Sequence, residues 1–204
     1  MSALLPILVG AYLLGGIPFG YLAGRLVAGV DLRRVGSGNL GATNAIRQLG
    51  WGWGSVVFGL DLLKGWVAVA LAQRFGGGAG AWLPVAAGLA AILGHSFTPY
   101  LRFKGGKGVA TSAGVFLRLA PVATGIALAV FLVVMLSSRI VSLSSLTATA
   151  ALPLLLLWRQ PDEPLLLGFA SLIAVLIWIR HRGNLRRLLR GEEPRLGGPR
   201  RGGA

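Results

Sequence analysis

The chain of 204 residues has no cysteine, only two histidines, and few charged residues, which make up 13% of the total. The absence of cysteine excludes disulfides, thiolate nucleophiles and zinc–thiolate sites. His95 and His181 lie too far apart in the sequence to indicate a metal site. The charged fraction is about half of the roughly 25% that is typical of a soluble domain. The chemistry of this protein therefore depends on groups other than thiols or bound metal.

Apolar residues dominate what is present. The hydrophobic fraction is 54% and the mean hydropathy is +0.72. A hydrocarbon core about 30 Å thick requires roughly 20 apolar residues per spanning helix, so this length accommodates at most about seven or eight spans and no separate soluble domain. We predict a single all-α, polytopic integral membrane domain over residues 1–204, with a basic, flexible tail from about residue 194.

Seven apolar runs are candidates for helices, although several are short for a membrane span. They cover about residues 3–27, 53–72, 81–93, 109–119, 121–136, 142–158 and 164–179. The first run lacks the basic start and the cleavage site of a signal peptide, so we expect a retained span. The two runs that meet at Pro121 could instead form one kinked helix, which would give six spans.

The charge is strongly positive, with 20 Lys and Arg against 6 Asp and Glu. On an apolar chain this surplus favours anionic lipid, phosphate-bearing ligands or topology signals, whereas nucleic acid is the weakest interpretation, because most aromatic residues lie in the apolar runs. With seven spans and the amino terminus outside, only Arg74, Arg118 and Arg159 lie in outside loops. Since Lys and Arg accumulate in inside loops, this pattern favours seven spans, with the carboxyl terminus inside.

The first polar inside segment, residues 35–47, combines three glycines with Ser, Thr, Asn and Arg donors. Glycine lets the backbone approach a ligand closely, so this composition predicts an anion site. The glycines also match the dinucleotide pattern G-x-G-x-x-G, but that pattern needs a strand before it in a βαβ unit, which we do not expect here. A glycine-rich turn with capping side chains is the alternative.

The second segment, residues 94–111, ends in a glycine loop directly before an apolar run. Backbone N–H groups at a helix start, next to Lys107, suit a phosphate. This is not a Walker loop, because Gly108 follows Lys107 where a magnesium-binding Ser or Thr would be required. His95 could act as a base, or equally as a helix cap or a buried hydrogen-bonding residue.

The third segment, residues 180–193, directly follows the last apolar run. If it is helical, His181 and Asn184 are three residues apart and share one face. Its many arginines also fit an anchor at the inner membrane surface, but that alternative does not explain His181 and Asn184. Within the second run, Asp61 and Lys64 predict an internal ion pair, and the alternative is that Lys64 adds positive charge to the site.

Taken together, these segments resemble the acyl-phosphate-dependent glycerol-3-phosphate acyltransferases of bacterial membranes, the PlsY family. The resemblance rests on residues 36–47, 94–111 and 180–193, and it extends over nearly the whole chain, including residues 141–145. It implies a seven-helix enzyme of the bacterial inner membrane with its motifs at the cytoplasmic face. It also implies acyl transfer from acyl phosphate to the sn-1 hydroxyl of glycerol 3-phosphate, giving lysophosphatidic acid and inorganic phosphate in the first step of phospholipid biosynthesis.

The resemblance further implies no metal and no cofactor, and neither acyl-CoA nor acyl carrier protein as direct donor. The expected partners are glycerol 3-phosphate, acyl phosphate and membrane lipid, and we expect a monomer. The residues it assigns to catalysis are Ser37, Arg47, Lys107, His181 and Asn184. Those assigned to substrate binding are Gly38, Asn39, Thr43, Asn44, Lys104, Gly105, Gly106, Gly108 and Ser142. Those assigned to structural support are His95, Arg187 and Glu193.

The H-x-x-x-x-D signature of other glycerolipid acyltransferases is absent, because Tyr100 is the fifth residue after His95. An acyl phosphate has a good leaving group, so orientation, worth up to roughly 7 to 11 kcal/mol, and charge stabilisation can supply most of the rate. The resemblance suggests that a substrate phosphate oxygen takes the hydroxyl proton. Two other classes stay open: a transporter with a midplane site in broken helices, and a non-catalytic scaffold whose basic tail binds anionic lipid.

Overall fold

The computed structural model describes residues 4–197, and this part of the chain is helical without any strand. Helix is the expected outcome for long apolar runs in a bilayer, because every backbone N–H and C=O group must find its partner within the segment. The all-α prediction is confirmed. The elements are α1 (Leu4–Gly16), α2 (Phe19–Ala28), α3 (Ala42–Leu49), α4 (Trp51–Phe75), α5 (Trp82–Ser96), the 3-10 turn η1 (Pro99–Leu101), α6 (Val109–Leu119), α7 (Pro121–Ser138), α8 (Val141–Arg159), α9 (Pro164–Arg180) and α10 (Arg182–Leu189).

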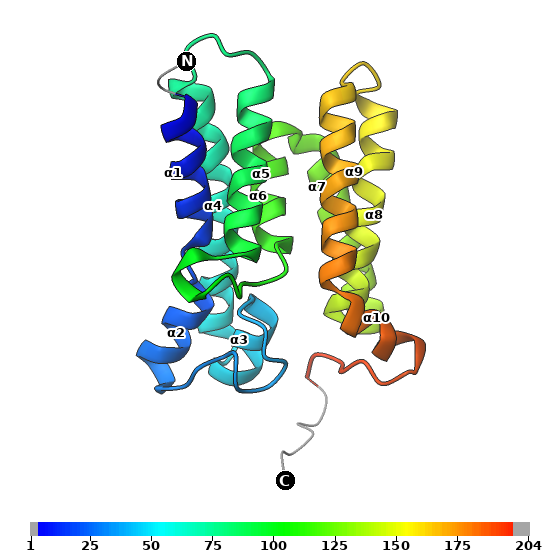
Figure 1. Cartoon of the computed structure of the whole chain (residues 1–204). Coiled ribbons are helices and arrows are strands. Elements are labelled where there is room, and N and C mark those ends of the chain that lie inside the picture. Colours follow the sequence, from blue (N-terminus) through cyan, green and yellow to red (C-terminus); the bar gives the residue numbers. More distant parts are fainter. Residues whose placement is uncertain (1–3, 198–204) are drawn as a thin grey trace.

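The long helices form two groups. Helices α1, α4, α5 and α6 pack together, and α7, α8 and α9 stand beside them (Figure 1). Between the groups, the rings of Phe116 in α6 and Phe169 in α9 stack with centroids 5.0 Å apart. Both rings belong to a buried apolar cluster that extends from Val69 in α4 to Ile177 in α9. The two groups therefore share one hydrophobic core, which places α9 next to α5 and α6.

Each of the seven expected runs contains a helix, but not every helix is long enough to cross a bilayer. Among residues 4–197, four segments are long and apolar enough: Leu4–Ala28, Trp51–Phe75, Pro121–Ser138 and Val141–Arg159. The bent pair of α9 and α10 would make a fifth. At about 1.5 Å per residue, α5 and α6 extend only about 22 Å and 16 Å, less than the roughly 30 Å hydrocarbon core. The count of seven spans stays a prediction.

We expected the first apolar run, residues 3–27, to form one continuous helix, but it does not. It breaks at Ile17 and Pro18, between α1 and α2. Proline has no N–H to donate, and it disfavours helical geometry in the residue before it. The break leaves backbone carbonyl groups without helical partners, and two of them are bonded instead by Thr98 and Lys64.

The predicted break before Pro121 is confirmed. Helix α6 ends at Leu119, Ala120 has non-helical backbone angles, and α7 begins at Pro121. One kinked helix through this region is therefore excluded, and Figure 1 shows α6 and α7 as separate helices. The break turns the chain from the first helix group into the second.

The first and third of the expected inside segments gather at one end of the molecule, and the second lies part-way toward that end. In Figure 1, α2, α3, α10 and the segments joined to them lie at the end opposite to the start of α1, whereas the α4–α5 and α8–α9 connections lie beside that start. The backbone N–H of Leu196 donates to the carbonyl of Arg139 at 2.7 Å, so the first residues of the expected flexible tail are docked on the α7–α8 link. Arg200 and Arg201 lie outside the described residues. Which compartment each end faces stays a prediction.

Candidate active site

The loop between α2 and α3, residues 29–41, is held by a single side chain. Asn44 is fully buried at the start of α3. Its amide nitrogen lies 3.0 to 3.1 Å from the carbonyl oxygens of Leu32, Val35 and Asn39, and its Oδ1 accepts the N–H of Ser37 at 3.1 Å. Asn44 was expected to bind substrate, but in this structure its polar atoms are committed to the loop backbone. It shapes the loop that presents Ser37.

Glycine is required in this loop. Gly36 and Gly38 have φ angles of +60° and +68°, which side chains with a Cβ rarely adopt. A Cβ on Gly36 would also lie 2.3 Å from Oδ1 of Asn44. The predicted glycine-rich turn is therefore present, and it leaves Ser37 exposed at the surface of the site.

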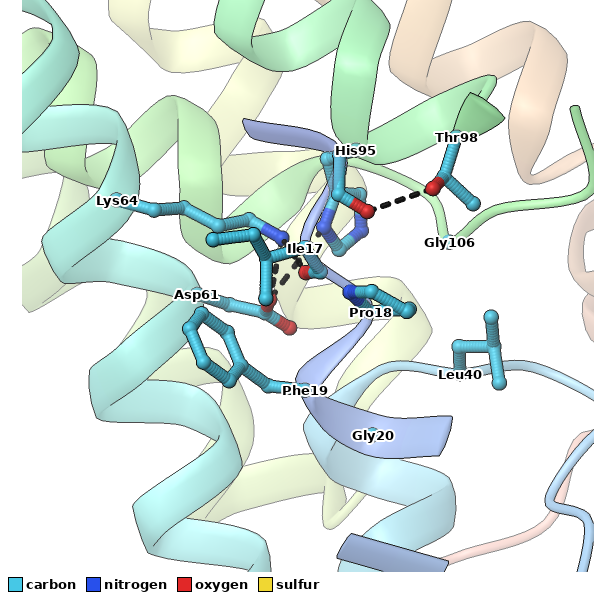
Figure 2. A pocket seen from close by; sticks show the side chains of 11 residues that line it. Ile17, Pro18, Phe19, Gly20, Leu40, Asp61, Lys64, His95, Thr98 and Gly106 are labelled. Carbon is cyan, nitrogen blue, oxygen red and sulfur yellow. Dashed lines mark hydrogen bonds and ion pairs between the residues drawn. The ribbon is translucent and has the colours of Figure 1, made fainter. Parts of the chain in front are cut away.

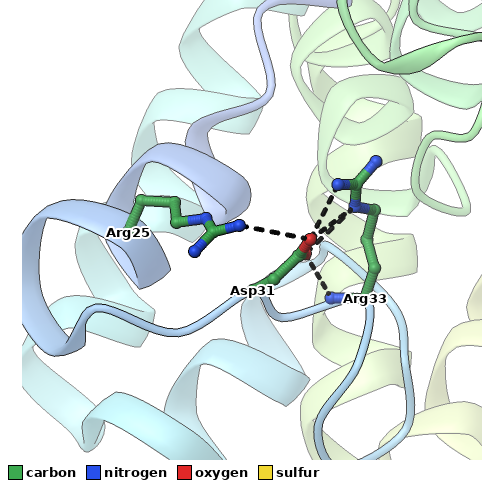
Figure 3. A network of polar contacts seen from close by, with 3 residues as sticks. All are labelled: Arg25, Asp31 and Arg33. Carbon is green, nitrogen blue, oxygen red and sulfur yellow. Dashed lines mark hydrogen bonds and ion pairs between the residues drawn. The ribbon is translucent and has the colours of Figure 1, made fainter.

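An ion pair closes the start of the same loop (Figure 3). The guanidinium of Arg33 contacts the buried carboxylate of Asp31 at 2.7 Å, and Arg25 lies 3.9 Å away. The hydrogen bonds from Arg33 lower the pKa of Asp31 to about 2, against the effect of burial. Both arginines also lie over the ring of Tyr21. Arg33 is therefore engaged within the loop itself, and Arg25 of α2 lies beside the same carboxylate.

The glycine loop of the second segment is bonded differently from our expectation. The N–H of Gly105 donates to the carbonyl of Ser96 at 3.2 Å, and that of Gly106 donates to the carbonyl of His95 at 3.0 Å. Arg180 of α9 donates to the carbonyls of both glycines at 3.1 and 2.9 Å. The N–H groups of Gly105 and Gly106 therefore do not cradle an anion. Both glycines support the position of Lys107.

Gly108 has a φ angle of +86° and immediately precedes α6. The first N–H groups of α6, which have no helical acceptor, therefore lie directly beside Lys107. This arrangement keeps the predicted combination of a lysine with a helix start, although the donors come from α6 and not from the two glycines before Lys107. It suits one phosphate group.

The third segment folds around Glu193. Its carboxylate accepts hydrogen bonds from Ser142 Oγ at 2.7 Å, Asn184 Nδ2 at 2.5 Å and Arg187 Nε at 2.7 Å. Burial favours the neutral carboxyl group, but these hydrogen bonds outweigh burial and hold the pKa of Glu193 below its usual range. The bracing expected of Arg187 and Glu193 matches this geometry. Ser142, which was expected to bind substrate, donates to Glu193.

Lys107 joins the second and third segments. Its ammonium donates to Asn184 Oδ1, so that side chain links Lys107 to Glu193. Burial lowers the pKa of Lys107 to about 8, and the nearby arginines Arg187, Arg180 and Arg47 add to this, while Glu193 opposes it. A partly buried lysine among other cations gains most from a bound dianion, because the anion relieves their mutual repulsion.

Arg47 joins the first and third segments. It lies in the last turn of α3, and its Nη2 donates to the carbonyl of Pro194 at 3.2 Å. These two residues are 147 positions apart in the sequence. The three segments therefore converge, as predicted, around Arg47, Lys107 and Asn184.

His181 is the N-cap residue of α10, one turn before Asn184. It lies between α9 and α10, which are bent by 65° relative to each other. His181 is buried, and its Nδ1 lies 2.8 Å from the carbonyl of Ile177. The bend therefore lies between the buried His181 side chain, bonded to α9, and Asn184 on α10.

The remaining expected binding residues lie on the first loop, at the start of α3, or on the loop before Lys107. Lys104 is exposed on the loop before the glycines, and Gly38, Asn39 and Thr43 lie on or beside the first loop. Among residues 4–197, no group of three or more His, Asp or Glu side chains could hold a metal ion.

An apolar pocket of about 500 Å³ adjoins the cluster. Helices α6 to α9 line it, from Val109, two residues after Lys107, to Ile177, four residues before His181. Its lining is almost entirely apolar. One end of an extended apolar ligand in this pocket would therefore lie beside Lys107 and the arginines near it.

The smaller pocket, of about 200 Å³, lies under the first two segments (Figure 2). Leu40 and Gly106 line it together with Asp61, Lys64 and His95. The predicted Asp61–Lys64 ion pair is present, with Nζ and Oδ1 2.7 Å apart. Sequence reasoning missed that His95 joins this pair, with Nδ1 3.5 Å from the same oxygen. In the sequence, the only indication of a further polar partner was the presence of two charged residues in the apolar run of α4.

Apolar helices that can cross a bilayer, with clustered cations beside an apolar pocket, define an integral membrane protein whose site suits a ligand that is both anionic and apolar. A family model described as glycerol-3-phosphate acyltransferase matches residues 5–191. The chain belongs to this family, which settles the choice between an acyltransferase and a transporter in favour of the acyltransferase.

Curated relatives and solved structures agree with this assignment. A glycerol-3-phosphate acyltransferase of Gloeobacter violaceus is 48% identical over 199 residues, 96% of each chain. One of Synechococcus sp. (strain CC9902) is 49% identical, over 97% of this chain and 96% of that one. Crystal structures of PlsY, an integral membrane glycerol 3-phosphate acyltransferase, match over 96% of both chains. The glycerol 3-phosphate form has a TM-score of 0.88 at 44% identity, and the lysophosphatidic acid form has 0.84 at 41%.

Proposed function

We propose that this chain transfers a fatty acyl group from acyl phosphate to the sn-1 hydroxyl of glycerol 3-phosphate, releasing lysophosphatidic acid and inorganic phosphate. The family supplies the acyltransferase activity and the acceptor class. The donor and the position of acylation are our inference from the site.

The observation that carries the choice of donor is the position of the apolar pocket. It begins at Val109, immediately after Lys107 and Gly108 at the start of α6. A fatty acyl chain in this pocket would place its head group at Lys107 and at the first N–H groups of α6, where a phosphate is favoured. An acyl phosphate has both parts, with the phosphate directly on the acyl carbon.

The acceptor would bind on the other side of Lys107. Asn184 of α10 accepts a hydrogen bond from Lys107, Arg47 of α3 bonds the carbonyl of Pro194, and His181 lies at the α9–α10 bend. Arginine recognises phosphate through several N–H groups, and Asn184 is oriented by Glu193. Ser37, at the tip of the first loop, would contact the same ligand, so the two phosphates lie on opposite sides of one lysine.

The chemical step then needs little beyond orientation. The sn-1 hydroxyl oxygen attacks the acyl carbon, the bond between that carbon and the phosphate oxygen breaks, and the hydroxyl proton passes to a phosphate oxygen of the substrate. Lys107 stabilises the negative charge that develops on the acyl oxygen and the leaving phosphate. Such preorganised charge stabilisation is worth about 3 to 4 kcal/mol per donor, which fits a site without a dedicated protein base.

The charge distribution supports a site that faces the cytoplasm of the bacterial inner membrane. The first and third basic segments lie at one end of the molecule and the second lies part-way toward it, and Lys and Arg accumulate on the cytoplasmic side of membrane proteins. We propose seven spans, with the short helices α5 and α6 keeping the glycine loop deep in the molecule. A monomer suffices, since all the residues invoked come from one chain.

The direct test uses purified protein in lipid nanodiscs with palmitoyl phosphate and glycerol 3-phosphate. We expect phosphate release that depends on glycerol 3-phosphate, and 1-acyl product by positional analysis. Palmitoyl-CoA in place of palmitoyl phosphate should give no product. Absence of phosphate release that depends on the acceptor, from folded protein, would overturn the proposal.

A second variant tests the apolar pocket alone. Ala148→Phe places a ring in the pocket that α6 to α9 line, so the preferred donor should become shorter while the KM for glycerol 3-phosphate stays constant. Unchanged chain-length preference would show that the acyl chain lies elsewhere. Ala150→Phe, on the exposed face of α8, is the matched control.

A further inference from the structure

Three charged or titratable side chains are buried together where no proposed substrate reaches. Their side-chain exposures are 3% for Asp61, 2% for Lys64 and 7% for His95. Asp61 Oδ1 lies 2.7 Å from Lys64 Nζ and 3.5 Å from His95 Nδ1, so one carboxylate oxygen serves both partners. Such a cluster is costly to bury, and apolar residues of similar size often give equal or better stability. Its presence in an apolar helix therefore calls for a role beyond stability.

Lys64 connects the cluster to the break between α1 and α2. Its Nζ donates to the carbonyl of Ile17 at 2.9 Å, one of the groups that the helix break leaves without a helical donor. Thr98, after α5, donates to the neighbouring carbonyl of Gly16 at 2.6 Å. The side chains in Figure 2 thus fix the position of the break relative to α4 and α5.

His95 connects the cluster to the glycine loop. A Cβ on Gly106 would lie only 2.2 Å from His95 Nε2, and one on Gly105 only 2.0 Å from the carbonyl oxygen of His95. The loop backbone therefore rests directly on both the ring and the main chain of His95. Any shift of this ring displaces the loop that ends in Lys107.

The same contact argues against His95 as a base. A histidine paired with a carboxylate is a familiar general base, but it needs a free ring nitrogen at the reacting hydroxyl. Here Gly106 covers Nε2, Asp61 faces Nδ1, and the residue is only 8% exposed. The pair can hold the loop, but it cannot reach a substrate.

We propose that Asp61, Lys64 and His95 are positioning residues. They fix the position of the Gly105–Gly106 loop, and therefore of Lys107, relative to the α1–α2 break and the first loop. Leu40 of the first loop lines the same pocket, so the cluster sets the separation of the two loops that contact the phosphates. The claim that the cluster affects catalysis rests on the proposed function, whereas the claim that it fixes the position of the loop does not.

The test compares His95→Ala and His95→Gln with Leu83→Ala. His95→Ala removes the support, and His95→Gln keeps a polar group of similar reach toward Asp61. Leu83 is fully buried in the same helix, α5, at the end far from the loop, so its truncation leaves a cavity without touching the site. Three quantities are measured: melting temperature in detergent, deuterium uptake of peptides covering residues 97–108, and kcat and KM for both substrates.

We expect faster deuterium uptake in residues 97–108 for His95→Ala, an intermediate rate for His95→Gln, and the wild-type rate for Leu83→Ala. Because displacement of a reacting group by about 1 Å can cost about 100-fold, kcat/KM should fall about 10- to 100-fold in His95→Ala and partly recover in His95→Gln. Leu83→Ala should lower the melting temperature without changing either KM.

Uptake in residues 97–108 equal to that of Leu83→Ala would overturn the proposal, as would kinetic losses that simply follow the melting temperature. The double variant Asp61→Asn/Lys64→Met avoids an unpaired buried charge and should reproduce the loop effect of His95→Ala. If this variant unfolds as readily as Asp61→Asn alone, the cluster serves folding only and the proposal is wrong. If wild-type protein transfers no acyl group, the proposed function fails, but the deuterium uptake still decides the role of the cluster.

Discussion

The two glycine-containing loops of the site are held in opposite ways. The loop before α3 is shaped by Asn44, which lies within twelve positions of every backbone group it bonds. The Gly105–Gly106 loop is fixed by Arg180, 74 and 75 positions away, and by His95, which depends on Asp61 of another helix. One loop carries its own support, whereas the other takes its support from α4, α5 and α9.

This difference gives the two loops different roles: one presents Ser37, and the other positions Lys107. A loop with local support keeps its shape while the helices move, so Ser37 is presented reliably. A loop that bridges two helix groups transmits any movement between them to Lys107. The variants below test this contrast between local and distant support.

The largest effect is expected for Lys107→Ala. It removes the cation at which the two phosphates are proposed to meet, and one charge-assisted hydrogen bond is worth roughly 1.5 to 3 kcal/mol, so kcat/KM should fall at least 10- to 100-fold. Lys104→Ala, in the same loop but exposed, should cost far less. Equal losses in both variants, measured by phosphate release, would contradict a special role for Lys107.

The next effect tests local support. Asn44→Ala leaves buried backbone groups of the first loop without partners, at about 1 to 3 kcal/mol for each unsatisfied group, so both stability and turnover should fall. Deuterium uptake should rise in residues 29–41 and stay unchanged in residues 97–108. Simultaneous loosening of both loops would show that they are not supported independently.

Distant support is tested by Arg180→Met, which keeps the apolar stem and removes the donors to Gly105 and Gly106. We expect roughly a 10-fold loss of kcat/KM, since these two bonds position Lys107 without touching substrate. Arg182→Met, an exposed neighbour on α10, is the control. If kcat/KM falls as much in Arg182→Met, the loss reflects the overall positive charge and not the hydrogen bonds to Gly105 and Gly106.

A smaller, several-fold effect should appear with pH. Lys107 is protonated below its pKa of about 8 and loses its charge above it, so the KM for a phosphate-bearing substrate should rise as the pH passes through about 8. In Lys107→Arg the cation persists, and this rise should vanish from whatever activity is left. A rise that stays near pH 8 in that variant would assign the titration to another group.

The smallest effect is expected at the carboxyl terminus. Pro194 and Leu196 are bonded to Arg47 and to the carbonyl of Arg139, so the chain up to residue 197 belongs to the site's support. Truncation after Gly197 should leave turnover unchanged, whereas truncation after Gly191, which removes Glu193, should abolish it. Loss of activity in the longer variant would favour a role for the basic tail in binding anionic lipid.

Much of the fold could be predicted from the sequence, because a bilayer permits few structures. Apolar runs specify helices, the break at Pro121 follows from proline geometry, and the basic segments specify one end. The family resemblance singled out Arg47, Lys107 and Asn184, and their roles stay a prediction. Sequence reasoning missed the break at Pro18, since that apolar run continues on both sides of the proline.

The sequence by itself determined that this is an all-helical membrane protein with three polar segments between or after its apolar runs, because hydrophobicity, proline and charge act locally. Only the tertiary structure decided which polar atoms are free for a ligand. Asn44, Gly105 and Gly106 use theirs on the backbone, and His95 meets a carboxylate from another helix. A hydrogen bond depends on the final positions of groups that are far apart along the chain, as between Arg47 and Pro194, and residue types alone do not give those positions.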